Sequence, residues 1–363
     1  YEFSKAVAFD TTNAIYYSKR GLSKYNFEDY RGAILDITKA LKLNPNNDEY
    51  YYDRGDAKFE LEDYNGSITD YDIAISINKN NAEYYSNRGL AKYELGNHND
   101  ALIDLEKAIA LDPQDGDYYN HRGLVKHEME DFKGAIDDFT KAILLDAEED
   151  YYYFNRGLSK NELKDYKEAI EDFSKAILID KEDGDYFYNR GCSKYELKEY
   201  ELAINDFNSA ISVDPTVANY YCNRAMAMDE LGKYSDALLD YDKAIELDTT
   251  DESFFYNRGN TKYSVEDYTS ALTDYNMAIK INASNQDQYN NRGLAKYQLK
   301  EYRNAIDDFT KAIELDYTDG DFFYNRALCK IEMKELTSAC DDLEKAKNLG
   351  NKDAKSMIKK NCK

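Results

Sequence analysis

The chain has 363 residues, and its 71 aspartate and glutamate residues outnumber 47 lysine and arginine residues to give a formal net charge of -24. This charge disfavours nucleic acid or an anionic membrane surface as a partner and favours a basic one, because like charges repel before contact. No run of 18 or more apolar residues is present, so the sequence offers no candidate for a membrane-spanning helix.

The first predicted element is a helix within residues 1–13. Phe3, Ala6 and Phe9, followed by Asp10, match the second half of a later repeat, such as Phe173, Ala176, Ile179 and Asp180. We therefore expect residues 1–13 to be the second helix of a truncated repeat, which in the full protein follows at least one more helix.

In residues 14–350 an arginine recurs at a fixed interval of 34 residues. The ten members are Arg20, Arg54, Arg88, Arg122, Arg156, Arg190, Arg224, Arg258, Arg292 and Arg326. A constant period between about 20 and 50 residues is typical of repeat proteins, in which each unit buries its apolar face only against its neighbours. We expect ten tandem repeats in one domain, and below we number each repeat so that Ala14 holds position 1.

Each repeat has the pattern of two amphipathic helices. Position 4 is aromatic throughout, as in Tyr85, and tiny residues hold positions 8, 20 and 27, as in Gly89, Ala101 and Ala108. A glycine such as Gly96 is a helix stop between the two blocks. The short connection predicts two antiparallel helices that approach closely at their small residues.

The last predicted element is a capping helix in residues 351–363. Ala354, Met357 and Ile358 share one side of it, and lysines lie elsewhere. Such a helix would cover the apolar end of the last repeat.

This 34-residue pattern resembles the tetratricopeptide repeat. The resemblance implies an all-α fold, a right-handed α-solenoid superhelix, whose first helices line a concave channel that binds segments of other proteins. The departures are arginine at position 7 and lysine at position 11, where the family usually has leucine and tyrosine.

The recurring arginines are matched by recurring acids at position 23. These are Asp36, Asp70, Asp104, Asp138, Asp172, Asp206, Asp240, Asp274, Asp308 and Asp342, and lysine holds position 11 in nine repeats. We interpret the arginines and aspartates as a ladder of hydrogen-bonded pairs between helices. The alternative is that the arginines recognise carboxylates or phosphates of a ligand.

Position 6 is asparagine in seven repeats. The members are Asn87, Asn155, Asn189, Asn223, Asn257, Asn291 and Asn325. They resemble the asparagine ladder of the O-GlcNAc transferase superhelix, which implies amide contacts with the backbone of an extended peptide. A carboxamide suits that role because it both donates and accepts. The alternative is that each amide bonds only its own helix or the next.

Aromatic and acidic residues complete the predicted binding surface. Position 12 supplies Tyr195, Tyr263 and Tyr297, and position 13 supplies Glu162, Glu196 and Glu230. Carboxylates beside aromatic rings favour lysine or arginine side chains of a ligand through charge and cation–π contact. A merely solvated acidic face is the alternative.

The five cysteines are an odd number at unrelated repeat positions, which is not the pattern of a disulfide framework. We therefore expect reduced thiols and a cytoplasmic protein. The three histidines lack the spacing of a metal site, and no catalytic or cofactor motif is present, so we expect no enzyme activity, metal or cofactor.

The sequence thus predicts a protein-interaction scaffold that binds an extended, basic peptide segment in the concave channel. Two alternatives remain: the substrate-recognition arm of a larger enzyme, and a structural spacer that self-associates through its repeat edges.

Overall fold

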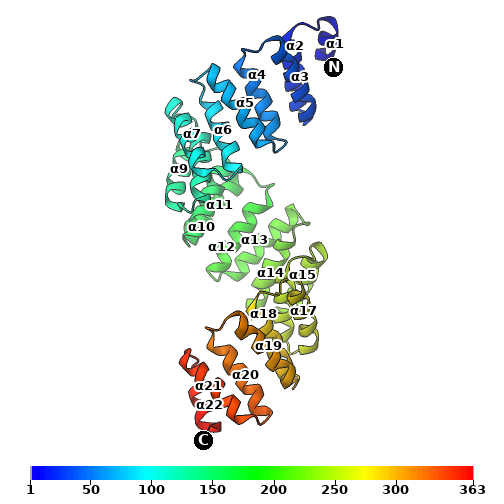
Figure 1. Ribbon diagram of the computed structural model, residues 1–363, viewed down its shortest axis with the longest axis vertical. Coiled ribbons are helices and arrows are strands. Elements are labelled where there is room, and N and C mark those ends of the chain that lie inside the picture. Colours follow the sequence, from blue (N-terminus) through cyan, green and yellow to red (C-terminus); the bar gives the residue numbers. More distant parts are fainter. Residues whose placement is uncertain (1, 363) are drawn as a thin grey trace. The chain divides into compact units, whose positions relative to one another are not determined.

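The computed structural model describes residues 2–362, and every regular element within this range is an α-helix (Figure 1). The helices fall into two compact units, Tyr1–Lys181 and Glu182–Lys363. None of the helices in the described range is long and apolar enough to cross a membrane.

The first unit holds helices α1 to α11. Their bounds are α1 Glu2–Phe9, α2 Ala14–Tyr25, α3 Tyr30–Leu43, α4 Asp48–Phe59, α5 Tyr64–Ile77, α6 Ala82–Glu94, α7 His98–Leu111, α8 Gly116–Glu128, α9 Phe132–Leu145, α10 Asp150–Glu162 and α11 Tyr166–Ile179.

The second unit holds helices α12 to α22. Their bounds are α12 Gly184–Glu196, α13 Tyr200–Val213, α14 Ala218–Glu230, α15 Tyr234–Leu247, α16 Glu252–Ser264, α17 Tyr268–Ile281, α18 Gln286–Gln298, α19 Tyr302–Leu315, α20 Gly320–Glu332, α21 Leu336–Asn348 and α22 Ala354–Asn361.

Within each unit, every helix packs against the next one along the chain, which confirms the predicted α-solenoid (Figure 1). The two helices of a repeat approach closely at position 8. A Cβ added to Gly55 would lie 2.6 Å from Cε1 of Tyr71, at position 24 of the same repeat. Ala74, at position 27, is fully buried. The small side chains therefore permit the close approach, and the position-24 side chains fill the space between the helices.

In the turn between the two helices, the residue at position 15 has a left-handed backbone conformation, with positive φ. Gly96 and Gly232 take it with φ of 74° and 69°, as the sequence predicts. The other eight repeats place a charged residue there with φ of 61–64°: Glu28, Glu62, Glu130, Lys164, Lys198, Glu266, Lys300 and Lys334. The following N–H then bonds the carbonyl at position 11, as from Asp29 to Lys24 at 2.9 Å. This bond satisfies a carbonyl of the last helical turn, which stabilises the turn without glycine.

The C-terminal helix α22 packs on α21. Ala354 is fully buried there, and Met357 and Ile358 contact the cluster that contains Phe323 and Leu343. Residue 363 of the predicted capping segment lies outside the described residues.

The interpretation of the cysteines is wrong for one pair. Cys340 of α21 and Cys362, which directly follows α22, form a disulfide. Because α22 folds back on α21, residues from different positions of the pattern meet, and the argument for a reducing compartment loses its basis. Cys192, Cys222 and Cys329 are free thiols.

Candidate functional site

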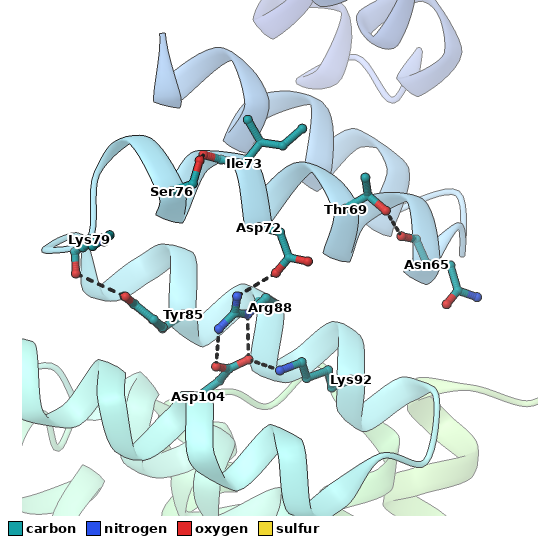
Figure 2. A network of polar contacts seen from close by, with 10 residues as sticks. All are labelled: Asn65, Thr69, Asp72, Ile73, Ser76, Lys79, Tyr85, Arg88, Lys92 and Asp104. Atoms are coloured by element: carbon teal, nitrogen blue, oxygen red, sulfur yellow. Dashed lines mark hydrogen bonds and ion pairs between the residues drawn. The ribbon is translucent and has the colours of Figure 1, made fainter. Parts of the chain in front are cut away.

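Each repeat contains a charged cluster centred on the position-23 aspartate. In the third repeat, Arg88 donates from Nε and Nη2 to the two oxygens of Asp104 at 2.8 and 2.5 Å (Figure 2). Lys92 donates to the same carboxylate at 2.6 Å. Nη1 of Arg88 reaches back to Asp72 of the preceding repeat at 2.6 Å. One guanidinium therefore joins both helices of its own repeat and the second helix of the repeat before it.

The predicted ladder is confirmed, because the two-bond arginine–aspartate pair is present in all ten repeats. Lysine joins the aspartate in nine repeats, and Met228 holds position 11 in the tenth. Each guanidinium also lies 5.5–5.8 Å from the ring at position 4 of its own helix. The protein's own groups thus engage the arginines, which favours the structural interpretation over recognition of a ligand anion.

The position-6 asparagines bond mainly to the preceding first helix. Nδ2 of Asn87 donates to the hydroxyl of Tyr52 at 2.8 Å and to Asp56 at 3.1 Å. Similar bonds to the first helix of the preceding repeat are made by Asn155, Asn223, Asn257, Asn291 and Asn325. Asn189 instead donates to the carbonyl of Asp185 in its own helix. The amide N–H groups therefore stabilise helix packing, and contact of these residues with a ligand stays a prediction.

The predicted tyrosines line the edge of the first helices. Tyr195, Tyr263 and Tyr297 are half-buried, and each contacts the ring at position 17 of its own repeat at 5.1–5.5 Å between centroids. Burial, with Glu230 nearby, raises the pKa of Tyr195 to about 12. Its phenol therefore stays neutral at physiological pH.

The predicted glutamates Glu162, Glu196 and Glu230 are exposed at the C-terminal ends of their helices. Glu230 accepts a bond from the Tyr200 hydroxyl at 3.2 Å. These carboxylates are accessible, but the structure does not gather them into one pocket.

The sequence interpretation missed a hollow in the first three repeats. Two adjoining cavities of about 300 and 240 Å³ share Tyr25, Tyr52 and Asp56 in their linings. We call their combined lining the acidic hollow: Leu22, Tyr25, Asn26, Ile37, Tyr52, Asp53, Asp56, Phe59, Glu60, Tyr71, Glu83, Asn87 and Leu90. Asn87 is the one predicted site residue in it.

Hydrogen bonds from neutral groups hold the acidic hollow together. The Tyr71 hydroxyl donates to Oδ1 of Asp56 at 2.7 Å, and Asn87 donates to the same oxygen at 3.1 Å. The Tyr52 hydroxyl donates to Glu83 at 2.9 Å. α4, α5 and α6 each contribute a side chain to this network, which fixes the orientation of its carboxylates.

Burial has the largest effect on the pKa values of the two aspartates in the hollow. Burial, together with the nearby charges of Asp56 and Glu49, raises the pKa of Asp53 to about 7. Burial also raises the pKa of Asp56 to about 6, although hydrogen bonds from Tyr71 and Asn87 act in the opposite direction. Both carboxylates therefore titrate near neutral pH.

The sequence contains a signal for this hollow. The second repeat has Asp53 at position 6, where seven other repeats have asparagine. It has Asp56 at position 9, where six other repeats have leucine. Departures from a strong repeat pattern thus point to the site more directly than the pattern itself.

A smaller hollow of about 170 Å³ lies at the equivalent place in the second unit. We call it the amide hollow, lined by Asn260, Tyr263, Ser264, Asn291 and Leu294. Tyr263 and Asn291 among the predicted residues line it; the remaining predicted residues lie outside both hollows.

The fold and these stacked helix pairs define a helical repeat protein. Family profiles described as TPR repeat match residues 55–96, 230–265 and 259–300. Profiles described as tetratricopeptide repeat match residues 82–115, 287–316, 116–149, 151–183 and 184–217. The chain belongs to the tetratricopeptide repeat family.

Solved structures of repeat proteins resemble the chain. The Cut9–Hcn1 hetero-tetramer of the APC/C matches with a TM-score of 0.54 and 16% identity, covering 99% of this chain and 92% of that one. A tetratricopeptide repeat protein from Parabacteroides merdae matches with a TM-score of 0.54 and 18% identity, covering 68% and 98%. YrrB, a TPR protein with a peptide-binding site, is 26% identical over 49% of this chain and 92% of its own, with a TM-score of 0.43.

The first two likenesses establish the fold alone. Among curated protein sequences, none matches the chain significantly. Family membership supports a protein-interaction scaffold.

Proposed function

We propose that the protein is a non-enzymatic scaffold that binds an extended, basic polypeptide segment along the first helices of its repeats. The observation that supports this most directly is the difference between two sets of carboxylates. The position-23 aspartates are buried and paired with arginine. The position-13 glutamates lie exposed at the C-terminal ends of the first helices, Glu60 as the C-cap of α4: Glu60, Glu94, Glu128, Glu162, Glu196, Glu230 and Glu332.

This division leaves the first helices with acidic groups that repeat every 34 residues, while the ladder engages the arginines of the same helices. An extended chain with regularly spaced cations can contact several such groups at once. Each contact is weak because solvent screens it. The binding free energies of several contacts add along the bound peptide, because one contact holds the next cation of the peptide at a high effective concentration near its carboxylate.

A pair of labelled peptides tests the proposal. A fluorescein-labelled decapeptide of alternating glycine and lysine should bind, as fluorescence anisotropy would detect, and the glycine–glutamate decapeptide should not. Affinity should fall as salt rises to about 0.5 M, because exposed charges are then screened. The triple variant Glu162→Gln, Glu196→Gln, Glu230→Gln should weaken binding of the basic peptide several-fold. Equal binding of the two peptides would contradict the proposal.

A further inference from the structure

The acidic hollow differs from the ladder in how its buried aspartates are held. Asp36 of the ladder is buried, which opposes ionisation, yet hydrogen bonds from Arg20 and Lys24 lower its pKa below the ordinary value. Asp53 and Asp56 lie in the hollow with raised pKa values of about 7 and 6. The ladder carries its counter-charge within the fold, and the hollow does not.

The lining of the hollow explains this difference. It contains Asp53, Asp56, Glu60 and Glu83, and among the described residues it includes no lysine or arginine. The charge of Lys19 of α2 acts to lower the pKa of Asp53, but Lys19 is an exposed residue outside both linings, and burial outweighs its effect. Four carboxylates that line adjoining cavities without a cation in the lining are expected to attract one from outside.

The remaining walls suit an organic cation. Tyr25, Tyr52 and Tyr71 present their rings beside the carboxylates, and a ring face attracts an ammonium group while its carbon stem packs on the apolar surface. Among the described residues, no group of three or more His, Cys, Asp or Glu side chains is arranged to hold a metal ion. The chemistry therefore favours an alkylammonium group.

The hydrogen bonds at Asp56 favour lysine over arginine at that carboxylate. A guanidinium binds best when both oxygens of one carboxylate are open to its planar fork. Oδ1 of Asp56 already accepts from Tyr71 and Asn87, so a fork would have to displace them. A compact ammonium with three rotatable donors can approach the remaining carboxylate oxygens from the cavity.

We infer that the acidic hollow is the subsite for a lysine side chain of the bound segment; this inference rests on the proposed scaffold function and names its anchoring point. The chain provides its own matched reference. In the amide hollow, Asn260 replaces Asp56 with the same hydrogen bonds, from Tyr275 at 2.9 Å and Asn291 at 3.0 Å. Asp56→Asn should therefore remove the charge and keep the geometry.

The test uses two probes on the full chain. The first is the glycine–lysine decapeptide, with the same peptide carrying acetyl-lysine as its neutral control. The second is n-butylammonium chloride, whose effect on the melting temperature is compared with sodium chloride at equal ionic strength. Asp56→Asn should weaken decapeptide binding about tenfold and abolish the melting shift. Asn260→Asp, which alters the other hollow, should not weaken decapeptide binding.

The outcomes separate the subsite from the scaffold. Decapeptide binding and a melting shift that Asp56→Asn leaves unchanged would overturn the subsite and leave the scaffold intact. A melting shift lost in Asp56→Asn, without any decapeptide binding, would support the subsite and contradict the scaffold. Absence of both effects in the unmodified chain would overturn both. A glycine–arginine decapeptide that binds more tightly than the lysine peptide would overturn the assignment to lysine.

Discussion

The acidic hollow and the amide hollow are the same construction six repeats apart. Tyr71 and Asn87 donate to Asp56 in the first, and Tyr275 and Asn291 donate to Asn260 in the second. Asn87 also donates to Tyr52 at 2.8 Å, as Asn291 does to Tyr256 at 2.9 Å. The two sites differ at their centre by a carboxylate in place of a carboxamide.

This difference shows that the repeat fixes geometry while single positions set chemistry. An amide can occupy the central place without charge, so the second hollow gains nothing from an external cation. A carboxylate in the same place loses hydration without gaining a counter-ion, and burial accordingly raises the pKa of Asp56 to about 6. Recognition by this protein is therefore expected to vary along the array although the backbone repeats.

The largest expected effect comes from the ladder beside each hollow. Asp70→Ala and Asp274→Ala each leave a partly buried arginine and lysine without their carboxylate. Each should lower the free energy of unfolding by about 3–5 kcal/mol, because an unpaired buried charge remains. Urea denaturation would measure both losses. The loss should be smaller for Asp274→Ala, because Arg258 keeps its ion pair with Asp242, whereas Arg54 keeps a bond to the Thr38 hydroxyl.

The exposed Asp307 supplies the control for the ladder variants. Asp307→Ala should change the free energy of unfolding by less than about 0.5 kcal/mol. A loss below about 1 kcal/mol in either ladder variant would show that the pairs do not stabilise the fold.

A smaller effect is expected at Gln288, which differs from its counterpart Tyr84 near the acidic hollow. Tyr84 is buried and its hydroxyl donates to Asp48 at 3.1 Å. Gln288 is fully buried, and among the described residues neither polar atom of its side chain has a hydrogen-bond partner. Gln288→Tyr should raise the free energy of unfolding by about 2 kcal/mol, because it removes a desolvated amide and places a hydroxyl near Glu252.

Thermal melting would measure the change at Gln288, and the reverse substitution sharpens the comparison. Tyr84→Gln should destabilise the first unit by a similar amount. Unchanged melting in both variants would show that the buried amide costs nothing in this fold.

The sequence could predict the helices and the ladder because each depends on spacing within one repeat. A 34-residue period places Arg88 and Asp104 at the same positions as their nine counterparts, so one inference applies ten times. The hollow depends instead on what three adjacent repeats place around Asp56, and the consensus conceals such departures. The Cys340–Cys362 bond was missed for a related reason: α22 folds back on α21, and no spacing rule describes that contact.

The asparagines show a further limit of the pattern. Their recurrence correctly indicated a shared role, but the sequence could not choose between a ligand and a neighbouring helix. The bond from Asn87 to Tyr52 depends on a position-5 residue of the preceding repeat, and position 5 varies among tyrosine, serine, asparagine, phenylalanine and cysteine.

The smallest expected effect is the pH dependence that Asp56 of the acidic hollow contributes. The pKa of Asp56 is raised from 3.8 to about 6 by burial, so the folded state retains a proton that the unfolded state releases. Between pH 4 and 6 Asp56 thus holds its proton more tightly in the folded chain than in the unfolded chain, and the stability that it contributes falls as pH rises. Asp56→Asn should remove this part of the fall, on the order of 1 kcal/mol after allowance for solvent screening.

Other groups around Asp56 require a charge-matched control. Glu83 and Asp53 face the same cavity. Because the pKa of Asp53 is near 7, the fall in stability with rising pH continues above pH 6 in Asp56→Asn and in the unmodified chain. Glu196→Gln removes one exposed carboxylate, so it changes the net charge equally without altering the hollow. Between pH 4 and 6 the urea midpoint should therefore fall less for Asp56→Asn than for Glu196→Gln, while Asn260→Asp should introduce a new fall in the second unit. Parallel pH profiles for Asp56→Asn and the unmodified chain would mean that the two hollows do not differ in charge, and the comparison between them would lose its physical basis.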